Sequence, residues 1–131
     1  MNKGGDPRIA HFVRDTLGCT CPETVFDRIA LHLGGPGRMI AKIELGGRLL
    51  IYLVDADRGP DIARQLGAAV QRGVVERDSR GFNRFRLVVL ASAAEAWIDR
   101  AEQVFRQLPQ RDARTHLHIV EPAVVATFLP R

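Results

Sequence analysis

The residues with the clearest chemical potential are two cysteines separated by a single residue, Cys19 and Cys21. Only the deprotonated thiolate acts as a nucleophile or a metal ligand, so the groups that lower the thiol pKa are decisive. Pro22 suits the first position of a helix, which would make Cys21 the N-cap and place its sulfur near free backbone N–H groups. The helix dipole there favours a negative charge by about 0.3–1 kcal/mol. Three acidic residues in the same segment act in the opposite direction: Asp15, Glu23 and Asp27.

Two adjacent thiolates suit a shared metal ion, but two ligands do not complete a tetrahedral site. His116 and His118 are candidates for the missing pair, because residues two apart on a strand project from the same face. Alternatively, two copies of the chain would bring four thiolates together and bind zinc or an iron–sulfur cluster. A Cys-x-Cys disulfide would close a tight, readily reduced ring, which leaves a thiol redox role open. Buried structural cysteines at a helix junction are the fourth interpretation.

The segment from Thr16 to Phe26, TLGCTCPETVF, resembles a segment of small prokaryotic proteins of uncharacterised function. The resemblance covers about the first quarter of the chain. It implies no activity, cofactor or partner. It does indicate that the Cys-x-Cys-Pro-Glu arrangement is a family feature.

The hydrophobic pattern around these residues predicts an α/β domain with the element order ααββαβαβ. Apolar residues at helical spacing predict helices over residues 7–17 and 22–33. Strict alternation and a Gly46-Gly47 turn predict a hairpin of strands over 39–45 and 49–54. The remaining expected elements are a helix over 60–72, a strand over 85–90, a helix over 94–108 that Ser92 and Glu95 cap, and a strand over 116–120. Val74 and Val75 suggest a short additional strand.

These elements predict a four-stranded mixed sheet flanked by helices. The strands that begin at Leu49, Phe85 and His116 are expected to be parallel through right-handed crossovers, and the hairpin is antiparallel. Sheets of this kind bind ligands at the carboxyl ends of their parallel strands. That rule points to four residues: Asp55, Asp57, Ser92 and Glu121.

Length and composition limit the class of protein. The 131 residues are 46% hydrophobic and 26% charged, which is typical of one globular domain spanning residues 1–131. Residues 1–6 are expected to form a flexible lead-in, and residues 122–131 an apolar C-terminal tail. No apolar run approaches the ~20 residues of a membrane span. The first residues lack the apolar core of a secretory signal, so a cytoplasmic location is predicted.

The formal net charge is +4, and most of the excess lies between residues 72 and 86. Four arginines in or beside this segment, with two phenylalanines between them, are candidates for an anion-binding or partner-binding surface: Arg77, Arg80, Arg84 and Arg86. A solvated loop and the polar face of a strand explain them equally well. No nucleic-acid-binding motif accompanies them, so nucleic acid is not the expected partner.

The favoured interpretation is a non-catalytic cytoplasmic protein that binds a thiophilic metal or cluster through Cys19 and Cys21, as a homodimer. The main alternative is an interaction module with structural cysteines. In that case the apolar tail over 124–129 or the arginine surface would contact another protein. A thiol oxidoreductase is a weaker third hypothesis.

Overall fold

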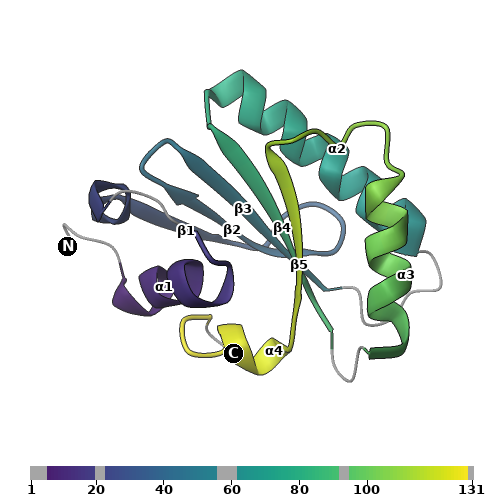
Figure 1. Cartoon of the computed structure of the whole chain (residues 1–131). Coiled ribbons are helices and arrows are strands. Elements are labelled where there is room, and N and C mark those ends of the chain that lie inside the picture. The colour runs from purple at the N-terminus through teal and green to yellow at the C-terminus, as the bar shows by residue number, and fades with distance from the viewer. Residues whose placement is uncertain (1–5, 20–22, 56–61, 92–94, 130–131) are drawn as a thin grey trace.

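The computed structural model describes residues 6–19, 23–55, 62–91 and 95–129. The chain begins with α1 (Pro7–His11), a π-helical turn η1 (Phe12–Thr16) and a 3-10 turn η2 (Glu23–Asp27). The elements that follow are β1 (Ile29–Leu33), β2 (Met39–Leu45), β3 (Leu49–Asp55), α2 (Ile62–Arg80), β4 (Arg84–Leu90), α3 (Glu95–Arg106), β5 (Thr115–Val120) and α4 (Pro122–Val125). Figure 1 shows these helices packed on a central sheet, which confirms the predicted α/β class.

The described strands form one mixed sheet of five, in the order β1-β2-β3-β4-β5. β2 pairs antiparallel with both β1 and β3, whereas β3, β4 and β5 are parallel to one another. The predicted hairpin and the predicted parallel strands are therefore confirmed. The predicted number of four strands is wrong, because β1 occupies a segment expected to be helical.

Strand β1 arises from a sequence that fits two periodicities. Apolar residues between 25 and 33 form a helical stripe, yet Ile29 and Leu31 also alternate as in a strand. The strand prevails because β2 offers a complete antiparallel partner, with Ile29 opposite Leu45 and Leu33 opposite Ala41. In this register Ile29 and Leu31 contact the core, while Leu33 is 59% exposed at the sheet edge.

The hairpin turn follows the prediction closely. Gly46 and Gly47 both adopt positive φ, at 57° and 69°, which is the requirement of a type I′ turn. The Arg48 N–H donates to the Leu45 carbonyl at 2.9 Å and closes the turn. β3 follows and is buried along almost its whole length, as a central strand should be.

Helix α2 is longer than the sequence pattern predicts. It continues through Val74 and Val75, so the short strand expected there is not formed. Gly73 resembles a helix breaker in the sequence, but its missing side chain serves packing: a Cβ there would lie 2.1 Å from the Phe85 ring. The helix ends where Gly81 adopts a φ of 79°.

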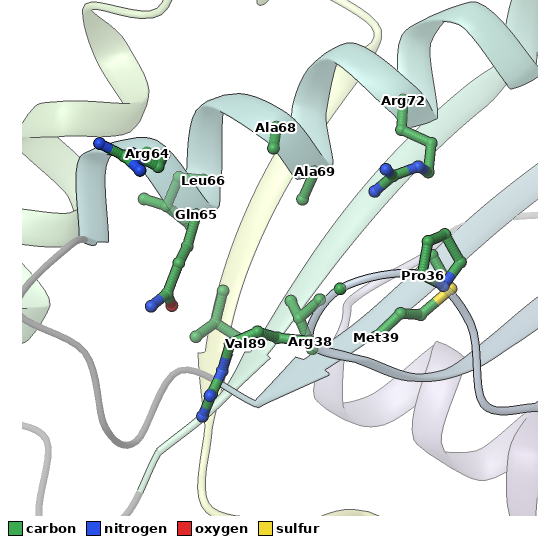
Figure 2. Close-up of a pocket in the computed structure, with 12 residues that line it drawn as sticks. Pro36, Arg38, Met39, Arg64, Gln65, Leu66, Ala68, Ala69, Arg72 and Val89 are labelled. Carbon is green, nitrogen blue, oxygen red and sulfur yellow. The ribbon is translucent and has the colours of Figure 1, made fainter.

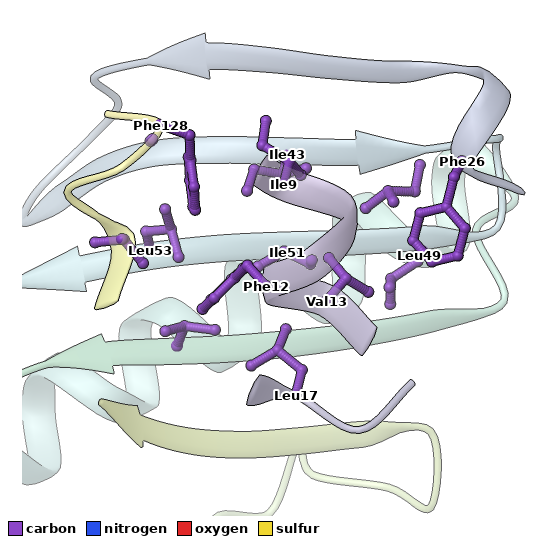
Figure 3. Close-up of a cluster of buried hydrophobic side chains, with 14 of the residues drawn as sticks. Ile9, Phe12, Val13, Leu17, Phe26, Ile43, Leu49, Ile51, Leu53 and Phe128 are labelled. Atoms are coloured by element: carbon purple, nitrogen blue, oxygen red, sulfur yellow. The ribbon is translucent and has the colours of Figure 1, made fainter. Parts of the chain in front are cut away.

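Each face of the sheet has its own apolar cluster. The face toward α2 and α3 buries residues such as Leu50, Val70 and Phe85. The opposite face is covered by α1, η1 and the C-terminal segment, and Figure 3 shows Phe12 and Val13 above the strands there. Arg86, His116 and His118 project toward this second face, because they alternate with residues of the first cluster.

The apolar C-terminal tail packs on its own domain. Phe128 is 5% exposed and its ring centroid lies 5.3 Å from that of Phe12. Val125 is buried in the same cluster. These two side chains are therefore part of the core, whereas Val124 is 38% exposed.

Candidate cysteine site

Cys19 lies directly after η1, at a corner where the chain turns. Gly18 adopts a φ of 71°, the left-handed conformation predicted for a residue that ends a helix. The Cys19 N–H donates to the Val13 carbonyl at 3.1 Å. The Cys19 side chain is partly buried against the apolar cluster on the sheet face that α1 covers. Cys19 is disulfide-bonded in the structure. Cys21, which is the predicted N-cap, and Pro22 lie outside the described residues.

Arg86 connects this corner to the sheet. Its Nη1 donates to the Leu17 carbonyl at 3.2 Å and lies 2.8 Å from Nε2 of His118. Its Nε is buried and has no hydrogen-bond partner. The guanidinium therefore binds a carbonyl that lies two residues before Cys19 in the chain, and its hydrogen-bond partners are neutral groups. We refer to Leu17, Cys19, Arg86 and His118 as the cysteine corner.

The contact with Arg86 determines the state of His118. Arginine only donates hydrogen bonds, so Nε2 of His118 must accept and its ring is neutral. Burial lowers the pKa of His118 to about 4, with further lowering by Arg86 and His116. Burial, followed by Arg86 and Arg84, also lowers the pKa of His116. The two histidines share a face, as predicted, but the Nε2 lone pair of His118 is already engaged.

The charges around the corner differ from those the sequence suggests. Burial, followed by Arg84, lowers the pKa of Arg86, which reflects a cation in a partly desolvated position. Asp15 is one of the acidic residues that the sequence places in the cysteine segment. Its carboxylate lies 2.7 Å from Nδ1 of His11, and its side chain is 61% exposed. No carboxylate pairs with Arg86 within the described residues. No group of three or more His, Cys, Asp or Glu side chains in that part of the chain is arranged to hold a metal ion.

The four candidate arginines do not form one surface. Arg77 is 1% exposed and its guanidinium binds Asp112 at 2.7 and 2.9 Å. Arg80 binds Glu44 and Glu76 at 2.7 Å each. Arg84 is exposed, and Arg86 belongs to the cysteine corner. Strand and helix geometry sends these side chains to opposite faces of the sheet, so the contiguous arginine surface expected from the sequence is not formed.

A polar cluster that the sequence pattern does not reveal centres on Glu76. Its carboxylate accepts hydrogen bonds from Tyr52, Lys42 and Arg80 at 2.5, 2.8 and 2.7 Å. Burial raises the pKa of Glu76, but these three donors outweigh it and hold the pKa at about 2. The hydroxyl of Tyr52 in an otherwise apolar strand was the one signal in the sequence. Because every member has a partner, this cluster is a structural link between β2, β3 and α2.

Two of the four strand-end candidates, Asp57 and Ser92, lie outside the described residues. Asp55 lies beside Arg38, with 3.9 Å between its carboxylate and the guanidinium. Glu121 precedes α4 and its side chain makes no capping hydrogen bond. The structure therefore places neither described carboxylate in a metal-binding group.

The fold and the corner define an α/β protein in which a partly buried arginine binds the Leu17 carbonyl, two residues before Cys19. Comparison with known protein families, with curated proteins and with solved structures finds no significant match. No helix in the described ranges combines the length and the apolar character needed to cross a membrane.

Proposed function

We propose that this is a non-catalytic protein whose reduced Cys-x-Cys segment binds a thiophilic metal ion or an iron–sulfur cluster. The observation that carries the proposal is the Arg86 guanidinium, which binds the Leu17 carbonyl beside the segment and pairs with no carboxylate among the described residues. A partly buried cation without an anionic partner is costly, and thiolates would supply that partner. The proposal concerns the reduced protein, because a disulfide offers no thiolate.

The charge of the corner favours completion of the site by a second copy of the chain. Four thiolates around a divalent zinc ion carry a net charge of −2, and iron–sulfur clusters with four thiolates are also anionic. Arg86 from each chain would balance that charge. Completion by His118 would instead require its Nε2 to give up the hydrogen bond with Arg86. His116 and His118 therefore support the site less well than a homodimer does.

The test is metal binding by the full chain, reduced and purified without oxygen or a metal-affinity tag. Zn²⁺ and Co²⁺ titrations would be followed by elemental analysis, absorption and sedimentation. We expect one metal per two chains, a dimer that forms with metal, and protected thiols until a chelator is added. Cys19→Ser should abolish binding. Arg86→Met should weaken it about tenfold, whereas the matched variant Arg84→Met, on the same strand, should not.

Native thiols that bind neither metal, with a monomer at every metal concentration, would contradict the proposal. Tight binding by monomers that is lost in His118→Gln would favour the histidine-completed site instead.

The disulfide at Cys19 favours a second candidate function, thiol–disulfide exchange. In that reaction the two thiols would pass two electrons and two protons to a disulfide substrate and become a disulfide themselves. A nearby cation such as Arg86 lowers thiol pKa values and increases the thiolate fraction. Turnover with a disulfide substrate, lost in Cys19→Ser, would support this function, and its absence despite reactive thiols would exclude it.

A further inference from the structure

A cavity of about 210 Å³ lies between α2 and the carboxyl ends of β3 and β4. Val54 and Val89, each the next-to-last residue of its strand, line it together with Met39 at the start of β2. Residues 36–38 and α2 form its sides (Figure 2). The cavity therefore occupies the place where sheets with parallel strands bind ligands. It opens on the α2 face, opposite the cysteine corner.

The described lining is cationic. It contains three arginines, Arg38, Arg64 and Arg72, and no acidic residue. Arg38 is partly engaged, since its Nε donates to the Asp55 carbonyl at 2.6 Å. Neither Arg64 nor Arg72 makes a hydrogen bond or an ion pair with any other described residue. Two guanidinium groups are thus available at the wall of an otherwise apolar cavity.

Gln65 adds a second polar signal. Its Oε1 is buried and has no hydrogen-bond partner, which is unusual because buried acceptors are nearly always satisfied. In Figure 2, Gln65 and Arg72 extend from α2 toward the loop and the strand ends. A cation and an unsatisfied acceptor therefore face the same space, above the apolar side chains of Met39 and Val89.

We propose that this cavity binds a small organic oxyanion, a carboxylate or a phosphate ester. The oxyanion would contact Arg72 and Arg64, and the apolar body would lie against Met39, Leu66 and Val89. A hydroxyl or N–H of the ligand would donate to Gln65. The volume is below the ~300–1,000 Å³ of sites for drug-sized molecules, so the ligand is a small metabolite.

The test uses the full chain and two probes that carry all three features, 4-hydroxybenzoate and 4-hydroxyphenyl phosphate. Inorganic phosphate and phenol serve as probes that lack the apolar body or the anion. Binding would be followed by the NMR signals of the methyl groups of Met39, Leu66 and Val89. We expect saturable shifts with at least one organic anion and weaker binding of both partial probes. The stronger of the two anions identifies carboxylate or phosphate as the recognised group.

Variants locate the site. Arg72→Gln should weaken binding about tenfold, whereas Arg84→Gln, on the other face, should leave it unchanged. Ala69→Leu fills the cavity and should abolish binding while unfolding stays cooperative. If Arg72→Gln fails to fold, Arg64→Gln at an exposed position provides the same test. The proposal is overturned if neither organic anion shifts these methyl groups, if inorganic phosphate binds as tightly, or if the folded arginine variant has wild-type affinity.

Discussion

Arg77 and Arg86 are two arginines with polar heads removed from water, yet their surroundings are opposite. Arg77, near the end of α2, binds the carboxylates of Asp112 and Asp78 and the hydroxyl of Thr115. Arg86, on β4, meets a backbone carbonyl and the ring of His118. Hydrogen bonds that Arg77 donates to Asp112 raise the pKa of Arg77, whereas burial lowers that of Arg86.

The difference separates a structural charge from a candidate functional one. A buried ion pair that satisfies all its groups holds elements together, and here it joins α2 to the segment before β5. A buried cation that lacks an anion is maintained at a cost, and such positions are found at binding sites. The carboxylate-paired groups of α2 and the cysteine corner should therefore respond differently to mutation and to acid.

The largest effect is expected from Arg77→Met. Removing the guanidinium leaves the carboxylate of Asp112 with no cationic partner, and among the described residues only the Thr115 hydroxyl and the Arg114 N–H still donate to it. We expect a loss of about 4 kcal/mol in the free energy of unfolding, measured by urea denaturation. Arg106→Met, at an exposed position on α3, is the control and should stay within about 0.5 kcal/mol of wild type. Equal free energies of unfolding for Arg77→Met and Arg106→Met would contradict a structural role for the Arg77 ion pair.

Acid should act on the paired groups at low pH. The Glu76 carboxyl has a pKa of about 2 in the folded protein against 4.5 for an unperturbed glutamate, so its stabilisation is complete above pH 4.5. That stabilisation, about 3 kcal/mol, is lost as the pH falls from 4.5 toward 2. Urea denaturation at stepped pH should show this slope in the wild type and a flatter one in Glu76→Gln. Identical slopes for the wild type and Glu76→Gln would contradict a stabilising role of the ionised Glu76 carboxylate.

The cysteine corner should weaken under milder acid. The neutral His118 ring has a pKa of about 4 when folded and 6.5 otherwise, so the unfolded chain binds the proton first. Stability is then complete above pH 6.5 and falls by about 3 kcal/mol as the pH drops toward 4. His118→Gln, whose amide oxygen can still accept from Arg86, should flatten this part of the profile. Above pH 7 the free energies of unfolding of the wild type and His118→Gln should depend on pH in the same way, which provides the internal control.

The smallest effect is expected from Arg86→Met. The variant removes two hydrogen bonds to neutral acceptors but also removes a partly desolvated charge, and these effects oppose each other. We expect a change of less than about 1 kcal/mol in the free energy of unfolding, by the same assay as Arg77→Met. A loss as large as that of Arg77→Met would make Arg86 a structural residue and erase the contrast between the two regions.

Elements with a local cause were predictable. Gly46-Gly47 determines its own turn, because only glycine adopts two successive positive φ values readily. β3 and β4 are so apolar that they had to be buried strands. By contrast, residues 29–33 fit two periodicities, and Gly73 looks like a break until the Phe85 ring is placed against it.

The candidate sites divide in the same way. The chemistry open to Cys19 can be predicted from the sequence, since it depends on residue type and spacing. Its neighbours are not, because Arg86 is 67 positions away and reaches Leu17 only through the packing of η1 on β4. The cavity arginines Arg38 and Arg72 likewise come from separate segments that meet above the strand ends.

By itself, the sequence determined the α/β class, the hairpin, the parallel strands and the positions of the two cysteines. These follow from side-chain periodicity and backbone preference, which act over a few residues. Tertiary structure decided that residues 29–33 are a strand, that Arg77 is paired with carboxylates and that Arg86, among the residues the structure describes, is not. Those outcomes depend on which surfaces are buried together, and burial is settled only when distant segments pack.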